Sequence, residues 1–198
     1  MNQIELAPSA LSPSPAITPP LDPAFCPAAL ANRVFRAAAR ATGGAASVRL
    51  ALEQADGSVS HHATEIFPAD APQAGSNFFH VERLVKFLLW ARGGFRLHFD
   101  GPRSVGEALQ RHFRDTATGR FDADTMGGRL YEQPFEVVIA SALPPARART
   151  APLGRHLDGC RIGFDLGASD RKVAAVHDGR VVFSEEVVWH PVPQTDPQ

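Results

Sequence analysis

The chain has few of the residues that build disulfide-bonded or zinc-stabilised folds. Only two of its 198 residues are cysteines, Cys26 and Cys160, and no Cys-x-x-Cys pair is present. The eight histidines are scattered, and the one adjacent pair, His61-His62, would point to opposite faces of a strand. Neither a disulfide framework nor a structural zinc site is therefore indicated.

Excess charge and long apolar segments are lacking as well. The formal net charge is -1, from 20 Lys plus Arg and 21 Asp plus Glu, which does not favour binding to nucleic acid or to an anionic membrane. No apolar run approaches the roughly 20 residues that cross a bilayer, and the N-terminus lacks the features of a signal peptide. We expect a cytoplasmic protein with no nucleic-acid or membrane partner.

Proline-rich segments divide the chain into parts. Residues 1–24 carry six prolines among Ser and Ala, which predicts a disordered leader. Residues 144–156, again rich in Pro and Arg, are predicted to be a linker. The fold class expected from this division is α/β, with a small mixed accessory domain over 25–143 and an incomplete second domain over 157–198.

The accessory domain is predicted to alternate helices with strands, as in an α/β layer. Asp56-Gly57 between two alternating runs is a strong hairpin signal, and Ser104 with Glu107 fits a capping box that opens a helix. Residues 115–132 are polar and are predicted to be irregular. The expected helices span 28–42, 77–92 and 104–114, and the expected strands span 47–54, 58–67, 95–99 and 134–142.

The second domain is predicted to begin as an antiparallel β-meander. Its strands are expected at 160–166, 172–177 and 181–189, with Asp178-Gly179 as a tight turn. An isolated meander would expose apolar strand residues, so we expect another lobe or a partner to cover them. These residues include Ile162, Phe164, Val181 and Phe183.

Two groups of side chains in the accessory domain favour a structural role over a chemical one. Aromatic residues of the 77–92 helix could form a sugar platform, but an aromatic helix face is more often core. They are Phe78, Phe79, Phe87 and Trp90. Carboxylates between 122 and 136 show no spacing that fixes them on one face, so they are predicted to be solvated. They are Asp122, Asp124, Glu132 and Glu136, and His98 is likewise predicted to be exposed.

Residues 165–172, Asp-Leu-Gly-Ala-Ser-Asp-Arg-Lys, form the candidate binding motif between two apolar segments. Gly167 permits close approach of a ligand and a positive φ, and successive amides in such a turn form a positively polarised nest for anionic oxygens. Ser169 adds a hydroxyl donor, and Lys172 can offset phosphate charge. Asp165, at the end of an apolar strand, is placed to hold Mg²⁺ through water. The alternative is an ordinary solvent-exposed β-turn.

The segment Ile162-Gly163-Phe164-Asp165-Leu166-Gly167-Ala168-Ser169, with Asp178-Gly179 after it, closely resembles the first phosphate motif and hairpin of ROK-family sugar kinases and repressors. The resemblance implies an actin-like, ribonuclease H-like ATPase lobe that binds ATP and Mg²⁺. Asp165 corresponds to the Mg²⁺-associated aspartate, and Gly167 and Ser169 correspond to the phosphate-loop Gly and Ser/Thr. Ala168 stands where the family has glycine. Segments 81–90, 129–135 and 154–159 resemble the N-terminal extension of some ROK-like proteins.

The same resemblance implies that the sugar-directed general base lies beyond residue 198. The expected function is therefore the N-terminal part of a ROK-like ATP-dependent sugar kinase, inactive on its own, with nucleotide and sugar as partners and a homodimer left open. A non-enzymatic protein of this family that senses sugar or nucleotide is the alternative. A third hypothesis places the function in residues 25–150, with an unnamed small ligand.

Overall fold

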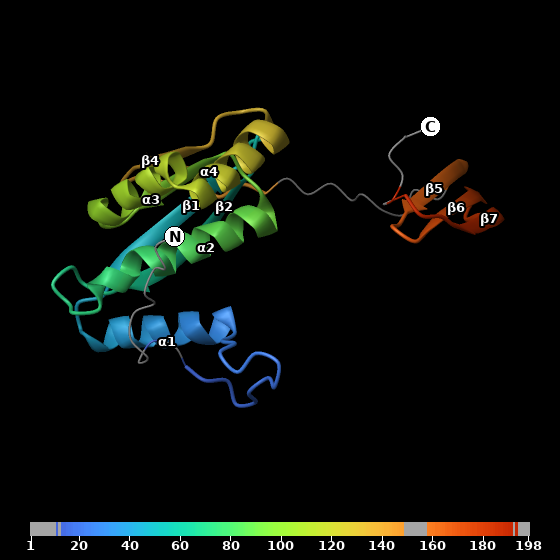
Figure 1. Cartoon of the computed structure of the whole chain (residues 1–198). Coiled ribbons are helices and arrows are strands. Elements are labelled where there is room, and N and C mark those ends of the chain that lie inside the picture. Colours follow the sequence, from blue (N-terminus) through green and yellow to red (C-terminus); the bar gives the residue numbers. More distant parts are fainter. Residues whose placement is uncertain (1–10, 12, 149–157, 192, 194–198) are drawn as a thin grey trace. The chain divides into compact units, whose positions relative to one another are not determined.

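The computed structural model describes residue 11, residues 13–148, residues 158–191 and residue 193. The chain divides into two compact units, Met1–Arg149 and Thr150–Gln198, which we describe separately (Figure 1). The first unit contains helices and a mixed sheet, and the second contains an antiparallel sheet. The predicted mixed α/β class is therefore confirmed. Residues 1–10 of the predicted leader and 149–156 of the predicted linker lie outside the described residues.

A four-stranded sheet of order β2-β1-β3-β4 underlies the first unit. Strand β1 is antiparallel to both β2 and β3, whereas β3 and β4 are parallel. The predicted Asp56-Gly57 hairpin joins β1 to β2, and Gly57 adopts the left-handed φ of 78° that this turn requires. The strands are β1 (Ala46–Glu53), β2 (Val59–Ile66), β3 (Arg96–Asp100) and β4 (Glu136–Ile139).

Among the described residues of this unit, five helices accompany the sheet, and one short 3₁₀ turn precedes α2. They are α1 (Ala28–Ala41), the 3₁₀ turn η2 (Ala74–Ser76), α2 (Asn77–Arg92), α3 (Arg103–Asp115), α4 (Ala117–Ala123) and the π-helix η3 (Asp124–Tyr131). The helices predicted near 28–42 and 77–92 are confirmed. Their ends follow local rules, since the glycines after α1 and α2, Gly43 and Gly93, both have left-handed φ.

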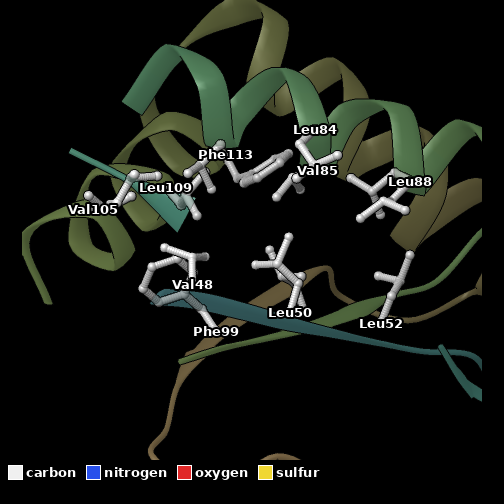
Figure 2. Close-up of a cluster of buried hydrophobic side chains, with 14 of the residues drawn as sticks. Val48, Leu50, Leu52, Leu84, Val85, Leu88, Phe99, Val105, Leu109 and Phe113 are labelled. Atoms are coloured by element: carbon white, nitrogen blue, oxygen red, sulfur yellow. The ribbon is translucent and has the colours of Figure 1, made fainter. Parts of the chain in front are cut away.

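The core lies between one face of the sheet and the helices. Figure 2 shows Val48, Leu50 and Leu52 of β1 and Phe99 of β3 facing side chains of α2 and α3. Alternate residues of β1 share this face because side chains of a strand alternate between its two sides. The helical contacts are Leu84, Val85, Leu88, Val105, Leu109 and Phe113. Each fully buried aliphatic side chain contributes about 1.5–3 kcal/mol to stability.

Two predictions for the middle of the chain are wrong. Helix α3 has no side-chain cap, because Pro102 rather than Ser104 precedes it and Glu107 accepts a hydrogen bond from Arg103 instead (2.8 Å). Residues 115–132 are not irregular but form α4 and η3. Helix α4 starts at a side-chain cap, since the amide of Gly119 donates to the hydroxyl of Thr116 at 3.0 Å.

Residues 141–147, here called the strap, run from the end of β4 back to the hairpin strand β2. Arg49 donates to the carbonyl of Ser141 (3.4 Å), and Nε2 of His61 lies 2.7 Å from the carbonyl of Pro144. Arg147 then exchanges two main-chain hydrogen bonds with Val59, of 2.8 and 3.0 Å. The strap thus connects β4 and β2, which form the two edges of the sheet.

The sheet face opposite the core carries a network of ion pairs. Nε2 of His98 lies 2.9 Å from Glu53, and Arg96 bonds Glu136 at 2.9 Å. The hydrogen bond from His98 is the main cause that holds the pKa of Glu53 below its usual value. The His98 side chain is only 15% exposed, so the prediction that it is exposed is wrong.

The second unit is a three-stranded antiparallel meander of order β5-β6-β7. Its strands are β5 (Cys160–Leu166), β6 (Asp170–His177) and β7 (Arg180–Val188). The predicted Asp178-Gly179 turn is confirmed, and both residues have left-handed φ values, 49° and 77°. The apolar residues Ile162, Phe164 and Phe183 are more than half exposed, as expected for this unit. In the described part of the chain, no helix combines the length and apolarity that crossing a membrane requires.

Acid is expected to destabilise the first unit through His80, which stacks on Phe35 (3.9 Å between ring centroids) and contacts Thr64 at 3.0 Å. Burial lowers the pKa of His80 from 6.5 to about 4. Between these two pH values His80 binds a proton in the unfolded chain but not in the folded one. The contribution of His80 to the free energy of unfolding is therefore fully present above pH 6.5 and is lost as the pH falls towards 4. Burial also lowers the pKa of His62 and of His112, which adds in the same direction.

Urea unfolding measured at several pH values tests this expectation. His80→Gln keeps a polar group near Thr64 but removes the titration, so its free energy of unfolding should fall less steeply with acid. One fewer titrating group reduces the slope by at most about 1.4 kcal/mol per pH unit. The exposed His177 provides the control, since His177→Gln should keep the original slope. An unchanged slope in His80→Gln would contradict the assignment.

Candidate functional site

The predicted phosphate motif forms the connection between β5 and β6. Asp165 and Leu166 end β5, residues 167–169 make the turn, and Asp170 begins β6. Across the ladder Asp165 pairs with Lys172, so the two predicted charged residues are direct neighbours. The structure therefore brings together all five predicted residues, which are Asp165, Gly167, Ala168, Ser169 and Lys172.

The carbonyls of this turn are held by Trp189, a residue that the sequence analysis did not identify. Its indole Nε1 donates to the carbonyl of Gly167 at 2.7 Å, and its amide donates to the carbonyl of Ser169 at 3.1 Å. Within the described ranges, neither Ala168 nor Ser169 donates its own amide to a protein acceptor. A turn in which two carbonyls already accept hydrogen bonds and two neighbouring amides remain available suits an anionic ligand.

Glycine at position 167 is explained by packing rather than by its φ. Gly167 is not among the described residues with left-handed φ. A Cβ there would lie 3.1 Å from the carbonyl oxygen of Asp170, closer than ordinary contact. The turn is therefore tight, and a side chain at 167 would displace the start of β6.

Lys172 is surrounded by carboxylates. Its ammonium lies 3.0 Å from Asp170 and 3.8 Å from Glu186. The hydrogen bond to Asp170 is the first cause that raises the pKa of Lys172, and the charges of Asp170, Glu186 and Asp165 act in the same direction. Three carboxylates against one ammonium leave this side of the turn negative, so a bare phosphate would be repelled and a divalent cation attracted.

These carboxylates fit Mg²⁺ held through water rather than in an all-protein cage. Within the described ranges, no group of three or more His, Cys, Asp or Glu side chains is placed to hold a metal ion. Mg²⁺ retains several waters and usually takes one or two carboxylates together with substrate phosphates. Asp165 is exposed on the strand next to the turn and meets that requirement.

A second group of polar side chains lies where α2, α3 and α4 meet. Asp122 is 1% exposed and accepts hydrogen bonds from Lys86 (2.9 and 3.1 Å) and from the indole of Trp90 (3.0 Å). The prediction that Asp122 is solvated is wrong, because α4 turns this residue toward α2. A carboxylate this buried is tolerated only when it is paired.

Glu82 is the second buried carboxylate of this group, with 4% exposure. It accepts two hydrogen bonds from Arg83, of 2.5 and 2.6 Å. Nε2 of His112 lies 3.5 Å from Glu82 and, within the described part of the chain, makes no hydrogen bond. Burial lowers the pKa of His112, so the ring is neutral near pH 7. The group therefore fixes Arg83 and Lys86 in position at the surface.

The aromatic face of α2 is exposed, contrary to the prediction of core. Phe79 is 47% exposed, Phe87 is 66% exposed and Trp90 is 49% exposed, whereas Phe78 packs against the core. The helix already buries another side, formed by Val81, Leu84, Val85, Leu88 and Leu89. Phe121 of α4 adds a fourth exposed ring, 56% accessible and 6.2 Å from Trp90.

A hollow of about 580 Å³ lies between the strap and the hairpin, lined by Arg49, Leu50, His61, His62, Ala63 and residues 141–143. Arg49 is paired with Asp100, and His61 contacts the carbonyl of Pro144. These two polar side chains therefore already have protein partners, and the β5–β6 turn is the stronger candidate for a ligand.

Comparison with known proteins identifies no family for this chain. No family model matches the chain, and neither a curated protein nor a solved structure matches it. The functional assignment therefore depends on the residues of the turn and on the resemblance of the motif.

Proposed function

We propose that the second unit supplies the first phosphate-binding hairpin of a ROK-like, ATP-dependent sugar kinase that acts in the cytoplasm. In this proposal β5–β7 begin the actin-like lobe, and the amides of Ala168 and Ser169 receive the phosphates. The observation that carries the proposal is the hydrogen bonding of the turn. Trp189 donates to the carbonyls of Gly167 and Ser169, while the amides of Ala168 and Ser169 have no acceptor among the described residues.

The charges around the turn support the magnesium complex of a nucleotide as ligand. Asp165 would hold a hydrated Mg²⁺ near the turn, and the cation would supply positive charge against the repulsion between the phosphates and the carboxylates of Asp170 and Glu186. Lys172, between these carboxylates, keeps the acidic group in place and adds one positive charge near the turn. Ser169 contributes a hydroxyl whose present contact with Asp170 is long, at 3.4 Å.

Phosphoryl transfer depends mainly on positioning and on electrostatic stabilisation of the transferred group. Mg²⁺, held through Asp165, would supply positive charge that offsets the charge of the phosphates. In this proposal, the residues of the turn bind and position the phosphates. None of the residues of the turn is assigned as the general base that would accept the sugar proton, so the turn is proposed to bind nucleotide and no phosphoryl transfer is assigned to it.

Replacing Asp165 with asparagine is expected to weaken Mg-ATP binding about tenfold, because a contact to a charged group contributes roughly 1.5–3 kcal/mol. Isothermal titration of the full chain with ATP, in the presence and absence of Mg²⁺, measures the effect. Binding of the unmodified chain should require Mg²⁺.

Glu185 provides the matched control, since it lies on β7 but pairs with Arg171 rather than with Lys172. Glu185→Gln removes the same unit of charge from the same meander and should leave the affinity unchanged. Equal affinities of the Asp165→Asn variant and the unmodified chain, or tight binding of ATP without Mg²⁺, would contradict the proposal.

A further inference from the structure

We infer that the outer face of α2 is a docking surface for a partner protein segment that presents apolar side chains flanked by carboxylates. This surface belongs to the first unit, whereas the proposed nucleotide turn belongs to the second. Its residues are Phe79, Arg83, Lys86, Phe87 and Trp90 of α2, together with Phe121 of α4.

The helical spacing places these side chains together. Positions 79, 83, 86, 87 and 90 fall on one side of an α-helix, at intervals of three and four residues. Four of the six residues are aromatic rings between 47% and 66% exposed. Monomeric proteins rarely expose contiguous apolar patches of this kind without a function, and Trp, Phe and Arg are enriched in protein interfaces.

Three of the four exposed rings, those of Phe79, Trp90 and Phe121, are held directly or through a neighbouring side chain by buried carboxylates. Asp122 accepts the indole hydrogen of Trp90 at 3.0 Å, and the Trp90 ring lies nearly parallel to Phe121, at 12°. Glu82 holds Arg83 with two hydrogen bonds, and the Arg83 guanidinium lies 5.8 Å from the centre of the Phe79 ring. Rings fixed before association lose less conformational entropy on binding, which favours affinity.

The charges specify the partner. The side chains of Arg83 and Lys86 are 48% and 32% exposed, whereas the carboxylates that pair with them, those of Glu82 and Asp122, are buried. Each pair therefore directs its positive end outward, and Arg120, next to Phe121, is exposed as well. A partner with carboxylates around its apolar anchors complements this arrangement, and one with Lys or Arg there does not.

A second copy of the chain is a poorer occupant. In a two-fold dimer the same patch meets itself, and this patch offers rings and cations but no exposed carboxylate, so Arg83 and Lys86 would find no anion on the other copy. Like charges across an interface oppose association. The geometry therefore favours a different protein over self-association.

Selection from a displayed library of random peptides tests this inference with the full chain as target. The chain carrying Phe87→Ser serves as counter-target, because Phe87 is the most exposed ring of the face and lies outside the hydrophobic core. The selected peptides should combine apolar residues with Asp or Glu. The best of them, made synthetically, should bind the Phe87→Ser chain at least about tenfold more weakly, as expected for an interface anchor.

Phe183→Ser is the matched control, since it removes a ring of 51% exposure from the other unit and should not change the affinity. Circular dichroism establishes that both variants remain folded. Selection of basic peptides, or of none that distinguishes Phe87→Ser, overturns the inference. Two further outcomes overturn the inference. One is sedimentation that shows a dimer of the unmodified chain that Phe87→Ser loses. The other is binding of phosphatidylserine vesicles by the unmodified chain that is as tight as its binding of the selected peptides.

Discussion

Replacing Asp122 with alanine is expected to lower the free energy of unfolding of the first unit by about 3 kcal/mol. The carboxylate is 1% exposed and is the acceptor for Lys86 and for the indole of Trp90. Its removal leaves a partly buried ammonium without its partner and a space beside α2. We take the low end of the range for a broken buried pair because the Lys86 side chain remains 32% exposed.

Urea denaturation of the full chain, followed by circular dichroism, measures this loss. Asp124→Ala provides the control two positions along the chain, because Asp124 is exposed and its removal should change stability by less than about 0.5 kcal/mol. The double variant Lys86→Met/Asp122→Leu should lose less than the two single variants together, because it leaves no unpaired charge. Equal stabilities of Asp122→Ala and Asp124→Ala would show that the buried pair contributes nothing.

The second large effect is expected at Gly119, where even a methyl group has no room. A Cβ at this position would lie 2.1 Å from the carbonyl oxygen and 2.6 Å from the carbonyl carbon of His112. These are main-chain atoms of α3, so neither can rotate away, and α4 must separate from α3. Gly119→Ala should therefore destabilise the first unit by about 3 kcal/mol, the upper part of the range for overpacking.

Gly128→Ala is the matched test, since no atom other than those of its chain neighbours and its own helical backbone lies within 4 Å of the position that the methyl group would take. In a helical segment alanine is favoured over glycine by up to about 1 kcal/mol, so this variant should be neutral or more stable. Thermal unfolding of the two variants compares them directly. If both have the same midpoint, the close approach of α4 to α3 is not a constraint on position 119.

Local sequence signals predicted the parts of the fold that depend on local chemistry. The hairpin at Asp56-Gly57 and the turn at Asp178-Gly179 use residues that accept left-handed φ, and both were predicted at the correct positions. Helices α1 and α2 combine helix-forming residues with a following glycine. In each case the residues that decide the structure are neighbours in the sequence.

Helix α4 and the π-helix could not be predicted in this way. Residues 117–131 contain Gly, Thr and Asp, which have low intrinsic helix propensity. Their stability depends on Asp122 reaching Lys86, which is 36 residues earlier in the chain. The exposure of Phe79 and Trp90 has the same origin: α2 is apolar on several sides, and packing against the sheet decides which of them is buried.

The candidate site was likewise predictable only for the residues that are contiguous in the sequence. The composition of residues 165–172 identified the turn, because Gly, Ser and Asp are informative next to a strand. The sequence did not indicate that Trp189 contacts the turn. Its position beside Gly167 depends on the register of β7 on β6, in which Asp170 lies opposite Val188. The acidic surroundings of Lys172 depend on the same register, which brings in Glu186.

The strap has a consequence for the order in which the first unit forms and opens. Its bridge joins Val59 to Arg147, two residues far apart in sequence, and Ser141 reaches Arg49 only after β4 has paired with β3. Closing so long a loop yields only two main-chain hydrogen bonds. We therefore expect the strap to form late in folding and to open early, which would expose the outer edge of β2 while the core between β1 and α2 stays closed.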